Sequence, residues 1–377
     1  MKIIPVYLPQ FHAIPENDEW WGKGFTEWTN VKAAKPHFEG HNQPRVPQGD
    51  NYYDLTDVEV LKWQCKLAKE HGIYGFCMYH YWFSGKLLLE KPMEILLAHP
   101  EIDIKYCISW ANGEWRDVWN PKKRDSEILI FDDFNNEQGW VDHFNYMLPF
   151  FKDPRYMSEN NKPLMVIYSP NLILKLNKML DCWTKMAQEA GFDGLTYIYQ
   201  SASAMLDKSW DRSKFSYGVQ MNPGYVRGVF SKQKSVLPQW SWKYIREIKR
   251  LLNIRKSLLK TKAASGVTTF DYDEAWQNML RLRPEEEGKI IPCAFSDWDN
   301  TPRYRDKGWL YTDVSTQRFK HYLSLLVENT KKYYKVDKIF VFAWNEWGEG
   351  GYLEPDELYG DGFLKAIKEV MQEQKNM

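Results

Sequence analysis

Glu346 and Glu349 stand three residues apart in the run Trp344-Asn345-Glu346-Trp347-Gly348-Glu349-Gly350. On a tight turn that contains glycine, two such carboxylates can project into one pocket and have different surroundings. One can then stay protonated as an acid while the other is ionised as a base or nucleophile, and cleavage of a glycosidic bond needs these two roles. The alternative is that both are solvated loop residues and the glycines only make the turn.

Aromatic and polar residues gather near this run and after other apolar runs of the chain. Aromatic content is 16%, with 18 Trp and 23 Tyr. These rings are flat and amphipathic, so they fill cores but also suit the apolar faces of sugars. The candidate contacts to substrate are Tyr7, Gln10, His12, Trp28, His80, Trp82, Trp110, Asn112, Glu114, Tyr168, Asp297, Trp298, Asp299, Asn345 and Trp347.

The histidines and acids do not follow a metal-binding pattern. Neither His12 nor His80 belongs to an H-E-x-x-H or H-x-x-x-H motif, and neither has a cysteine partner, so we expect no metal and no cofactor. Hydrogen bonding to sugar hydroxyls or a structural role remains for both histidines. The cluster Asp297-Trp298-Asp299-Asn300 lacks calcium-loop spacing. It is expected to bind substrate hydroxyls or to brace the first loop.

Elements that place these residues at one end of a fold can be read from eight short apolar runs. Continuous apolar character is typical of strands that are buried on both faces, as in parallel sheets. The runs are Ile3–Tyr7, Gly75–Tyr79, Tyr106–Ser109, Leu164–Tyr168, Thr196–Tyr199, Tyr217–Gln220, Ile290–Ala294 and Ile339–Ala343.

Amphipathic stretches between the runs indicate helices, among them Val58–Glu70, Leu172–Ala190 and Thr316–Asn329. Two of them end in glycine just before the next run, at Gly72 and Gly191. Eight such units predict an α/β protein, a (β/α)₈ TIM barrel of one domain over residues 1–377 with long βα loops. A doubly wound open sheet is the alternative, but no G-x-G-x-x-G follows the first strand. In a barrel, the active site lies at the carboxyl ends of the strands.

A basic stretch interrupts the pattern between the sixth and seventh predicted strands, at residues 222–287. Lysines, arginines and apolar residues alternate at helical spacing over Lys243–Lys262. This segment is expected to be either a solvated face of an insertion or a contact to an anionic membrane, a lipid-linked glycan or a polyanionic glycan.

Charge and cysteine content bound the remaining functions. The formal net charge is zero, so no overall charge draws the chain to nucleic acid, and any charged partner must be read from local patches. The five cysteines are scattered and odd in number, which argues against a disulfide framework. The apolar run at the start of the chain is too short for a signal peptide, and no apolar segment is long enough to span a bilayer. We therefore expect a cytoplasmic protein, and its oligomeric state stays open.

Long motifs in the chain resemble the WbsX-type family of bacterial polysaccharide and O-antigen biosynthesis, which is related to glycoside hydrolase family 99. The resemblance covers about residues 3 to 365, and the motifs are these: Tyr7-Leu8-Pro9-Gln10-Phe11-His12, the run from Asn17 to Asn30, Tyr79-His80-Tyr81-Trp82-Phe83, Trp298-Asp299-Asn300-Thr301 and Trp344–Gly350.

This resemblance implies a (β/α)₈ barrel and a retaining reaction on manno-configured α-linked glycans, such as those of mannose or rhamnose. Glu346 would deprotonate the 2-hydroxyl, which attacks the anomeric carbon to give a 1,2-anhydro sugar. Glu349 would protonate the leaving group and then activate the acceptor.

Two departures from the family patterns stand out. The position that is often His in family 99 is Gly348 here, which is expected to widen the leaving-group side. The chain reads Trp110-Ala111-Asn112-Gly113-Glu114-Trp115 where WbsX-type chains commonly read W-A-N-E-x-W, so the acid is displaced by one residue.

Three functions are consistent with these residues. The first is a glycoside hydrolase, endo- or exo-acting, on an oligo- or polysaccharide. The second is a glycosyltransferase or transglycosidase of capsule, O-antigen or lipopolysaccharide assembly. The third is a non-catalytic glycan-binding barrel.

Overall fold

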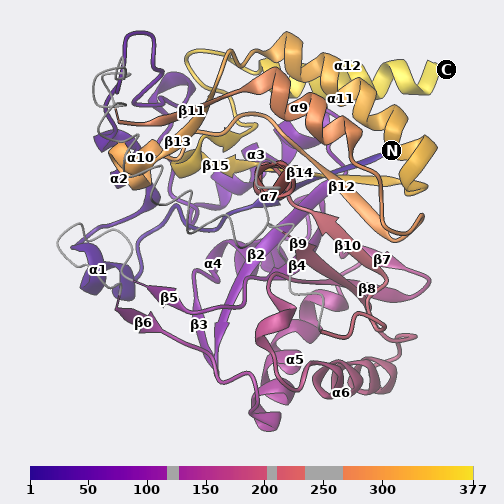
Figure 1. Cartoon of the computed structure of the whole chain (residues 1–377). Helices are drawn as coiled ribbons and strands as arrows, with labels where there is room; N and C mark the ends of the chain where they lie inside the picture. The colour runs from indigo at the N-terminus through magenta and orange to yellow at the C-terminus, as the bar shows by residue number, and fades with distance from the viewer. Residues whose placement is uncertain (117–126, 202–209, 234–265, 377) are drawn as a thin grey trace, which may run out of the picture.

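The structure is a computed structural model, and it describes residues 1–116, 127–201, 210–233 and 266–376. Eight parallel strands form a closed barrel (Figure 1). Each strand pairs with the next one along the chain, and β1 pairs with both β14 and β2, which closes the ring. The barrel strands are β1 (Lys2–Tyr7), β2 (Gly75–Phe83), β4 (Lys105–Trp110), β8 (Lys162–Ile167), β9 (Thr196–Ser201), β10 (Tyr217–Gln220), β12 (Ile290–Phe295) and β14 (Lys338–Phe342).

All eight predicted strands are present, and the predicted (β/α)₈ fold is confirmed. The largest difference is in β2, which continues to Phe83 instead of ending at Tyr79. This strand is buried along its whole length, because its inner face meets the barrel interior and its outer face meets helices.

Helices surround the barrel, and loops at the carboxyl ends of the strands carry further short helices. Around the strands lie α3 (Val58–Glu70), α4 (Lys91–Ala98), α5 (Glu137–Phe151), α6 (Leu176–Glu189), α7 (Gly224–Gln233), α9 (Tyr272–Arg281), α11 (Thr316–Asn329) and α12 (Gly362–Asn376). The loops carry α1 (Pro15–Trp21), α2 (Glu27–Ala33) and α10 (Thr301–Tyr304). In Figure 1, α5 and α6 cover one side of the barrel, and α11 packs beside α12 on another.

Helix boundaries follow local chemistry. α3 begins after Asp57, whose carboxylate accepts a hydrogen bond from the amide of Glu59. Gly72 and Gly191 follow α3 and α6 with φ of 79° and 95°, the left-handed conformation that favours glycine. α6 begins at Leu176 rather than at the predicted Leu172, because a 3₁₀ turn over Pro170–Leu172 precedes it.

Short strands and turns complete the described chain. The short strands are β3 (Lys86–Leu88), β5 (Trp115–Arg116), β6 (Ile128–Ile130), β7 (Ser158–Glu159), β11 (Thr268–Asp271), β13 (Trp309–Thr312), β15 (Asn345–Glu346) and β16 (Gly351–Tyr352). The 3₁₀ and π turns are Gln48–Asp50, Pro170–Leu172, Arg305–Lys307, Thr330–Tyr334 and Trp347–Glu349.

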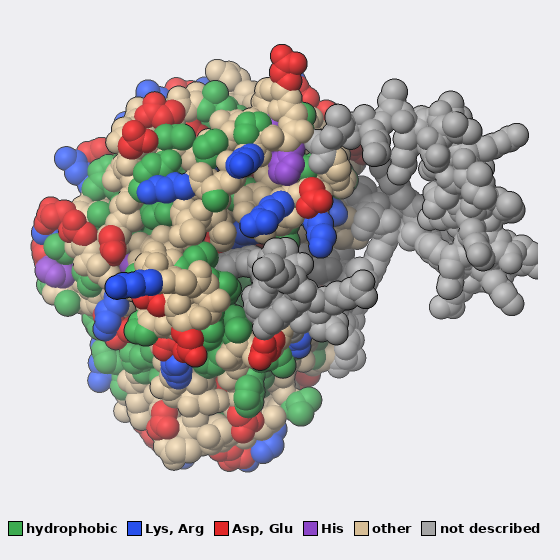
Figure 2. All heavy atoms as spheres, turned by 90° about the vertical axis from the view of Figure 1, so that its left-hand side faces the viewer, with side chains coloured by type: hydrophobic (Ala, Val, Ile, Leu, Met, Phe, Trp, Pro, Cys, Tyr) green, Lys and Arg blue, Asp and Glu red, His purple; other side chains and the backbone are tan. Residues whose placement is uncertain are grey.

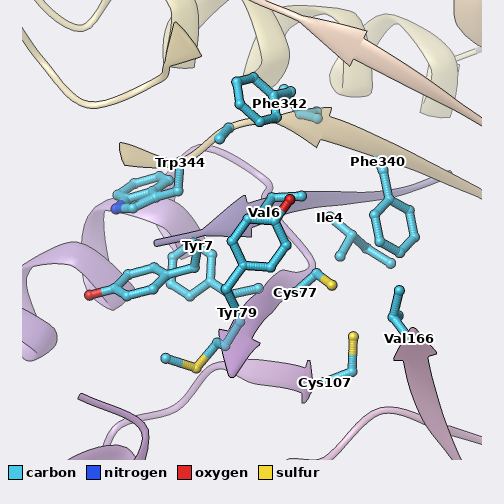
Figure 3. Close-up of a cluster of buried hydrophobic side chains, with 14 of the residues drawn as sticks. Ile4, Val6, Tyr7, Cys77, Tyr79, Cys107, Val166, Phe340, Phe342 and Trp344 are labelled. Carbon is cyan, nitrogen blue, oxygen red and sulfur yellow. The ribbon is translucent and has the colours of Figure 1, made fainter. Parts of the chain in front are cut away.

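The barrel interior is filled by side chains from several strands. Figure 3 shows Ile4, Cys77, Cys107, Val166 and Phe340 meeting there, all almost completely buried. Residues two apart on a strand share a face, so Tyr79 lies inside with Cys77. All five cysteines of the chain are free.

The surface and the basic stretch can be described only in part. On the face shown in Figure 2, Lys and Arg side chains lie interspersed with Asp and Glu. The predicted basic segment Lys243–Lys262 lies outside the described residues, and the described flanks of 222–287 form α7, β11 and α9. Among the described helices, none is both long and apolar enough to cross a membrane.

Candidate active site

The run that contains Glu346 and Glu349 forms a tight hairpin directly after β14. β15 pairs antiparallel with β16, so Glu346 lies opposite Gly351, and a 3₁₀ turn over Trp347–Glu349 joins the two strands. Gly350 closes the turn with φ 68°. A side chain at Gly350 would lie 2.9 Å from the backbone nitrogen of Asp299, which donates a hydrogen bond to the carbonyl of Glu349 at 2.7 Å. Glycine is therefore required here for both conformation and space.

Both carboxylates meet the same guanidinium group. Arg303 Nη2 lies 3.0 Å from Glu346 Oε1, and Arg303 Nη1 lies 3.1 Å from Glu349 Oε1. The remaining guanidinium nitrogen, Nε, donates to Glu27 Oε2 at 3.2 Å. Glu346 also accepts a hydrogen bond from the backbone amide of Glu349 at 3.2 Å. Three acids thus surround one cation.

Burial changes how these groups bind protons. Burial raises the pKa of Glu346 to about 8, with Glu349 and Glu27 adding to the rise and Arg303 opposing it. Burial also raises the pKa of Glu349, again against Arg303. For Arg303, burial favours the neutral form, but the three carboxylates raise its pKa well above the ordinary value. At neutral pH the pair is therefore expected to hold a proton beside a permanent cation.

Polar side chains from other strand ends complete this site. Gln10, after β1, accepts a hydrogen bond from Arg303 Nη2 at 3.4 Å and donates one to the Tyr81 hydroxyl at 3.1 Å. Burial raises the pKa of Tyr168, after β8, and of Tyr304, on α10, and the charge of Glu349 adds to both rises. Both tyrosines therefore lie near the pair. The structure thus brings the predicted Gln10 and Tyr168 together with Glu346 and Glu349.

A cavity of about 330 Å³ opens at Arg303 and Glu27, next to the guanidinium group that contacts the pair. Gln10, Glu27 and Arg303 contribute to its lining together with the indole rings of Trp21 and Trp115. The predicted Glu114 also lines this cavity and forms an ion pair with Arg116. The mixture of aromatic rings, hydrogen-bonding groups and charges is typical of sugar-binding sites.

Several predicted contacts support the hairpin of Glu346 and Glu349 instead of facing the cavity. The Asn345 side chain accepts a hydrogen bond from the Leu8 amide at 2.8 Å and donates one to the Leu8 carbonyl at 2.9 Å. Trp347 is buried, stacks on Tyr352 with centroids 3.7 Å apart and donates to a carboxylate oxygen of Glu354 at 2.7 Å. Asn345 and Trp347 therefore hold the hairpin in place.

Trp28 supports the same region from α2. Its ring packs 5.4 Å from that of Trp347, and its indole nitrogen donates to the Tyr53 carbonyl at 2.8 Å. Glu354 receives hydrogen bonds from Trp347, Tyr53 and Gln64, and burial raises its pKa to about 7. Trp28 is thus a packing residue under the site.

The acidic cluster after β12 matches the bracing alternative. Asp297 pairs with buried Arg45 at 2.8 Å. Asp299 lies 2.8 Å from His41 Nε2 and accepts from Gln43 at 2.7 Å, so it ties the first loop to α10. Burial alone would raise the pKa of Asp299, but the hydrogen bonds and Arg45 hold it at about 2. Trp298 stacks on Trp309 with centroids 4.9 Å apart.

His80, Trp82 and Trp110 do not face the site, which corrects their prediction as substrate contacts. All three pack against His143 of α5, with His80 Nε2 lying 2.9 Å from His143 Nε2. Strand alternation explains this placement, because Tyr81 faces the interior and its neighbours must face the helices. Burial lowers the pKa of His80 to about 3, so it stays neutral.

Three further predicted contacts are Tyr7, Asn112 and His12. The Tyr7 hydroxyl donates to Gln64 of α3 at 2.8 Å, which places this ring behind the barrel wall. Asn112 exchanges two hydrogen bonds with the backbone of Ser169 and so joins two loops. His12 is 1% exposed, and burial lowers its pKa. Tyr7 and Asn112 thus use their polar atoms for contacts within the protein, and His12 stays a predicted contact.

Glu27 and Arg303 were not found as site residues from the sequence. They are separated by 276 positions, and no local pattern links an acid at the start of α2 with an arginine on α10. Tyr81 could have been found, because it lies two residues beyond Tyr79 on β2 and so shares its inward-facing side. Among the described residues, no group of three or more His, Cys, Asp or Glu is arranged to hold a metal ion.

Known proteins are similar to this chain over nearly its whole length. The family model with the description Glycosyltransferase WbsX matches residues 3–367. The uncharacterized protein WxcX of Xanthomonas campestris pv. campestris, strain B100, is 31% identical over 375 residues, as is WxcX of a second strain. The match covers 98% of this chain and 49% of WxcX, so the chain spans about half the length of the curated relatives it matches.

Solved structures similar to this one include two of the family 99 endo-α-mannosidase from Bacteroides thetaiotaomicron, one in complex with bis-tris-propane. They give TM-scores of 0.56 and 0.55 at 12% identity, and each match covers 99% of this chain and 97% of the other. The likeness shows a common barrel fold.

Proposed function

The chain belongs to the glycosyltransferase WbsX family of carbohydrate-active enzymes, and we propose that it acts on α-linked, manno-configured glycans through Glu346 and Glu349. The observation that carries the proposal is the placement of both carboxylates, at the carboxyl end of the barrel, on Arg303, which lines an aromatic cavity. Active sites of barrel enzymes lie at this end.

The proposed reaction follows the route of family 99. Ionised Glu346 takes the proton of the sugar 2-hydroxyl, and that oxygen forms a bond to the anomeric carbon. The glycosidic C–O bond breaks as Glu349 gives its proton to the leaving oxygen. Glu349, now ionised, takes a proton from the acceptor hydroxyl, which opens the 1,2-anhydro ring, and Glu346 returns its proton to the 2-oxygen. Configuration at the anomeric carbon is retained.

The unliganded site does not hold its proton where this route begins. Glu346 is the more buried partner, with a side chain 3% exposed against 16% for Glu349. Burial favours the proton on Glu346. The route therefore requires the proton to pass to Glu349 before the 2-hydroxyl is deprotonated.

A second candidate is transfer of the glycosyl group to a sugar hydroxyl in place of water. The family description as a glycosyltransferase favours it, and the same two carboxylates serve both outcomes. The acceptor alone distinguishes the two reactions.

The test is a screen of aryl α-mannosides, aryl α-rhamnosides and bacterial polysaccharides in ¹⁸O-labelled water. Free sugar that carries ¹⁸O at C1 indicates hydrolysis, and an elongated product without label indicates transfer. Proton NMR of the first product formed should show a retained α-configuration. Binding without any product would contradict the proposal and favour a non-catalytic glycan-binding barrel, and an inverted product would contradict the anhydro-sugar route.

A further inference from the structure

Glu27 is a third carboxylate of the site, and its position on the chain is unlike that of the other two. It is the first residue of α2, it is 2% exposed, and it lines the cavity together with Arg303. Its carboxylate accepts a hydrogen bond from Arg303 Nε, while Nη1 contacts Glu349 and Nη2 contacts Glu346. Because a guanidinium is planar, fixing Nε fixes the direction of both Nη groups.

Gly348 provides the space for this arrangement. A Cβ atom at Gly348 would lie 2.5 Å from Glu27 Oε2 and 2.8 Å from Arg303 Nε, closer than real Cβ contacts allow. The sequence led us to expect that the missing side chain would widen the leaving-group side. It does not, because Glu27 and Arg303 occupy that space. This glycine and the Glu27–Arg303 pair therefore form one structural unit.

Within the part of the chain that the structure describes, the titratable groups that act on the pair come from four elements. α2 contributes Glu27, and α10 contributes Arg303 and Tyr304. β2 contributes Tyr81, and the loop after β8 contributes Tyr168. Burial raises the pKa of each of these three tyrosines, so they stay neutral in the physiological range. Of the described charges, those of Glu27, Arg303 and the pair itself shift the pKa values of the pair. Glu114 and Arg116 also line the cavity, and they pair with each other.

With three acids and one cation, full ionisation would leave a buried net charge of minus two. Such an excess is costly away from water, so one acid keeps a proton. If Glu27 were neutral, Arg303 would be compensated only by the pair, and both of those carboxylates could ionise more easily.

We propose that Glu27 is a positioning residue of the reaction, which orients Arg303 toward both catalytic carboxylates and offsets its charge so that the pair retains one proton. This inference rests on the proposed function, because it takes Glu346 and Glu349 as the reacting groups. Glu27 acts through Arg303 and need not touch the substrate.

The experiment is an NMR titration of the whole chain labelled with ¹³C at the glutamate carboxyl carbon. The Glu346 and Glu349 signals are assigned by their loss in Glu346→Gln and Glu349→Gln. Glu27→Gln keeps an oxygen to accept from Arg303 Nε but removes the charge. We expect the upper titration midpoint of the pair to fall by about one pH unit or more, because a nearby negative charge typically raises the pKa of a carboxyl group by this amount.

Arg303→Met tests the same balance from the side of the cation, and it should move the midpoint upward. Glu159→Gln is the matched control, since it removes a carboxylate that pairs with Lys338 at the other end of the barrel. It should leave the midpoint where it is in the wild type. An unchanged midpoint in Glu27→Gln, or a fall in Arg303→Met, would overturn the inference. Circular dichroism of each variant establishes that it is folded.

A kinetic arm applies once a substrate has been identified. The alkaline limb of the kcat profile should move to lower pH in Glu27→Gln, and Glu27→Asp, which keeps the charge, should restore it toward the wild-type position. A purely structural role would lower kcat at every pH without moving the limb, and that result would also overturn the inference. The NMR titration needs no substrate, so it tests the inference even if the wild type shows no turnover and the proposed function fails.

Discussion

The backbone amide of Glu349 donates a hydrogen bond to the carboxylate of Glu346, three residues earlier on the same turn. The turn therefore fixes the Glu346 carboxylate against the backbone of Glu349, and Arg303 contacts both carboxylates. Their roles differ only through burial and proton content, so each should be needed separately.

We predict that Glu346→Gln and Glu349→Gln each lower kcat by at least about a hundredfold, since general acid and base groups typically contribute this much. Amide side chains keep the hydrogen-bonding shape of the site, so both variants should stay folded. Initial rates and thermal unfolding on the same samples provide the check. Near-normal turnover in either variant would remove that carboxylate from the mechanism.

The pH dependence of stability should report the buried acid. Glu346 has a pKa of about 8 in the folded protein, above its value in an unfolded chain. The folded state therefore binds more protons, and the stabilisation that this brings is complete below about pH 4.3 and is lost as pH rises toward 8.

Glu346→Gln cannot ionise, so its Tm relative to wild type should increase from pH 5 to pH 8 and then level off. Differential scanning calorimetry at matched ionic strength measures this. Glu59→Gln, on the exposed face of α3, should show a Tm difference that stays flat across the same range. A flat difference for Glu346→Gln as well would mean that its pKa is not raised.

Gly348→Ala should separate space from backbone conformation. The φ angle of Gly348 is not positive, so alanine can adopt its backbone geometry. The added methyl group, however, would clash with Glu27 and Arg303. Displacing Arg303 should lower kcat by up to about a hundredfold, the cost of a misplaced catalytic group. Gly139→Ala on α5, where the nearest atom would lie at 3.6 Å, is the control and should retain full activity.

Trp82 should be a residue of stability and not of binding. It packs behind the barrel wall, with its ring stacked 4.7 Å from that of His143. Trp82→Ala is expected to lower the free energy of unfolding by about 3–5 kcal/mol, as measured in urea, while KM of the folded protein stays unchanged. Trp115→Ala should do the opposite, raising KM with a smaller loss of stability, because Trp115 lines the cavity.

The barrel and the tight turn of Glu346 and Glu349 could be predicted from the sequence because both are local patterns. Each strand is a continuous apolar run, and the turn after β14 carries its glycines and glutamates within seven positions. Some predicted substrate contacts were wrong because their side chains point to the outer face of the barrel. Trp82 and Trp110 do end strands, but they occupy outward positions, and the strand-end rule does not distinguish the two faces.

Arg303 and Glu27 were missed for a different reason. The first loop and the loop after β12 meet only in three dimensions, through contacts such as that of His41 with Asp299. Tertiary ion pairs of this kind leave no periodicity in a single sequence.

The Asn345 side chain binds both the amide and the carbonyl of Leu8, across 337 positions of the chain. Closing so long a loop is entropically costly and needs the strands between to be in place. The turn of Glu346 and Glu349 is therefore attached to the end of the first strand only when the ring has closed. A chain still emerging from the ribosome lacks this attachment until its last barrel strand is free, so a nascent chain should be unable to cleave or transfer glycans, and turnover should serve as a direct reporter of completed folding.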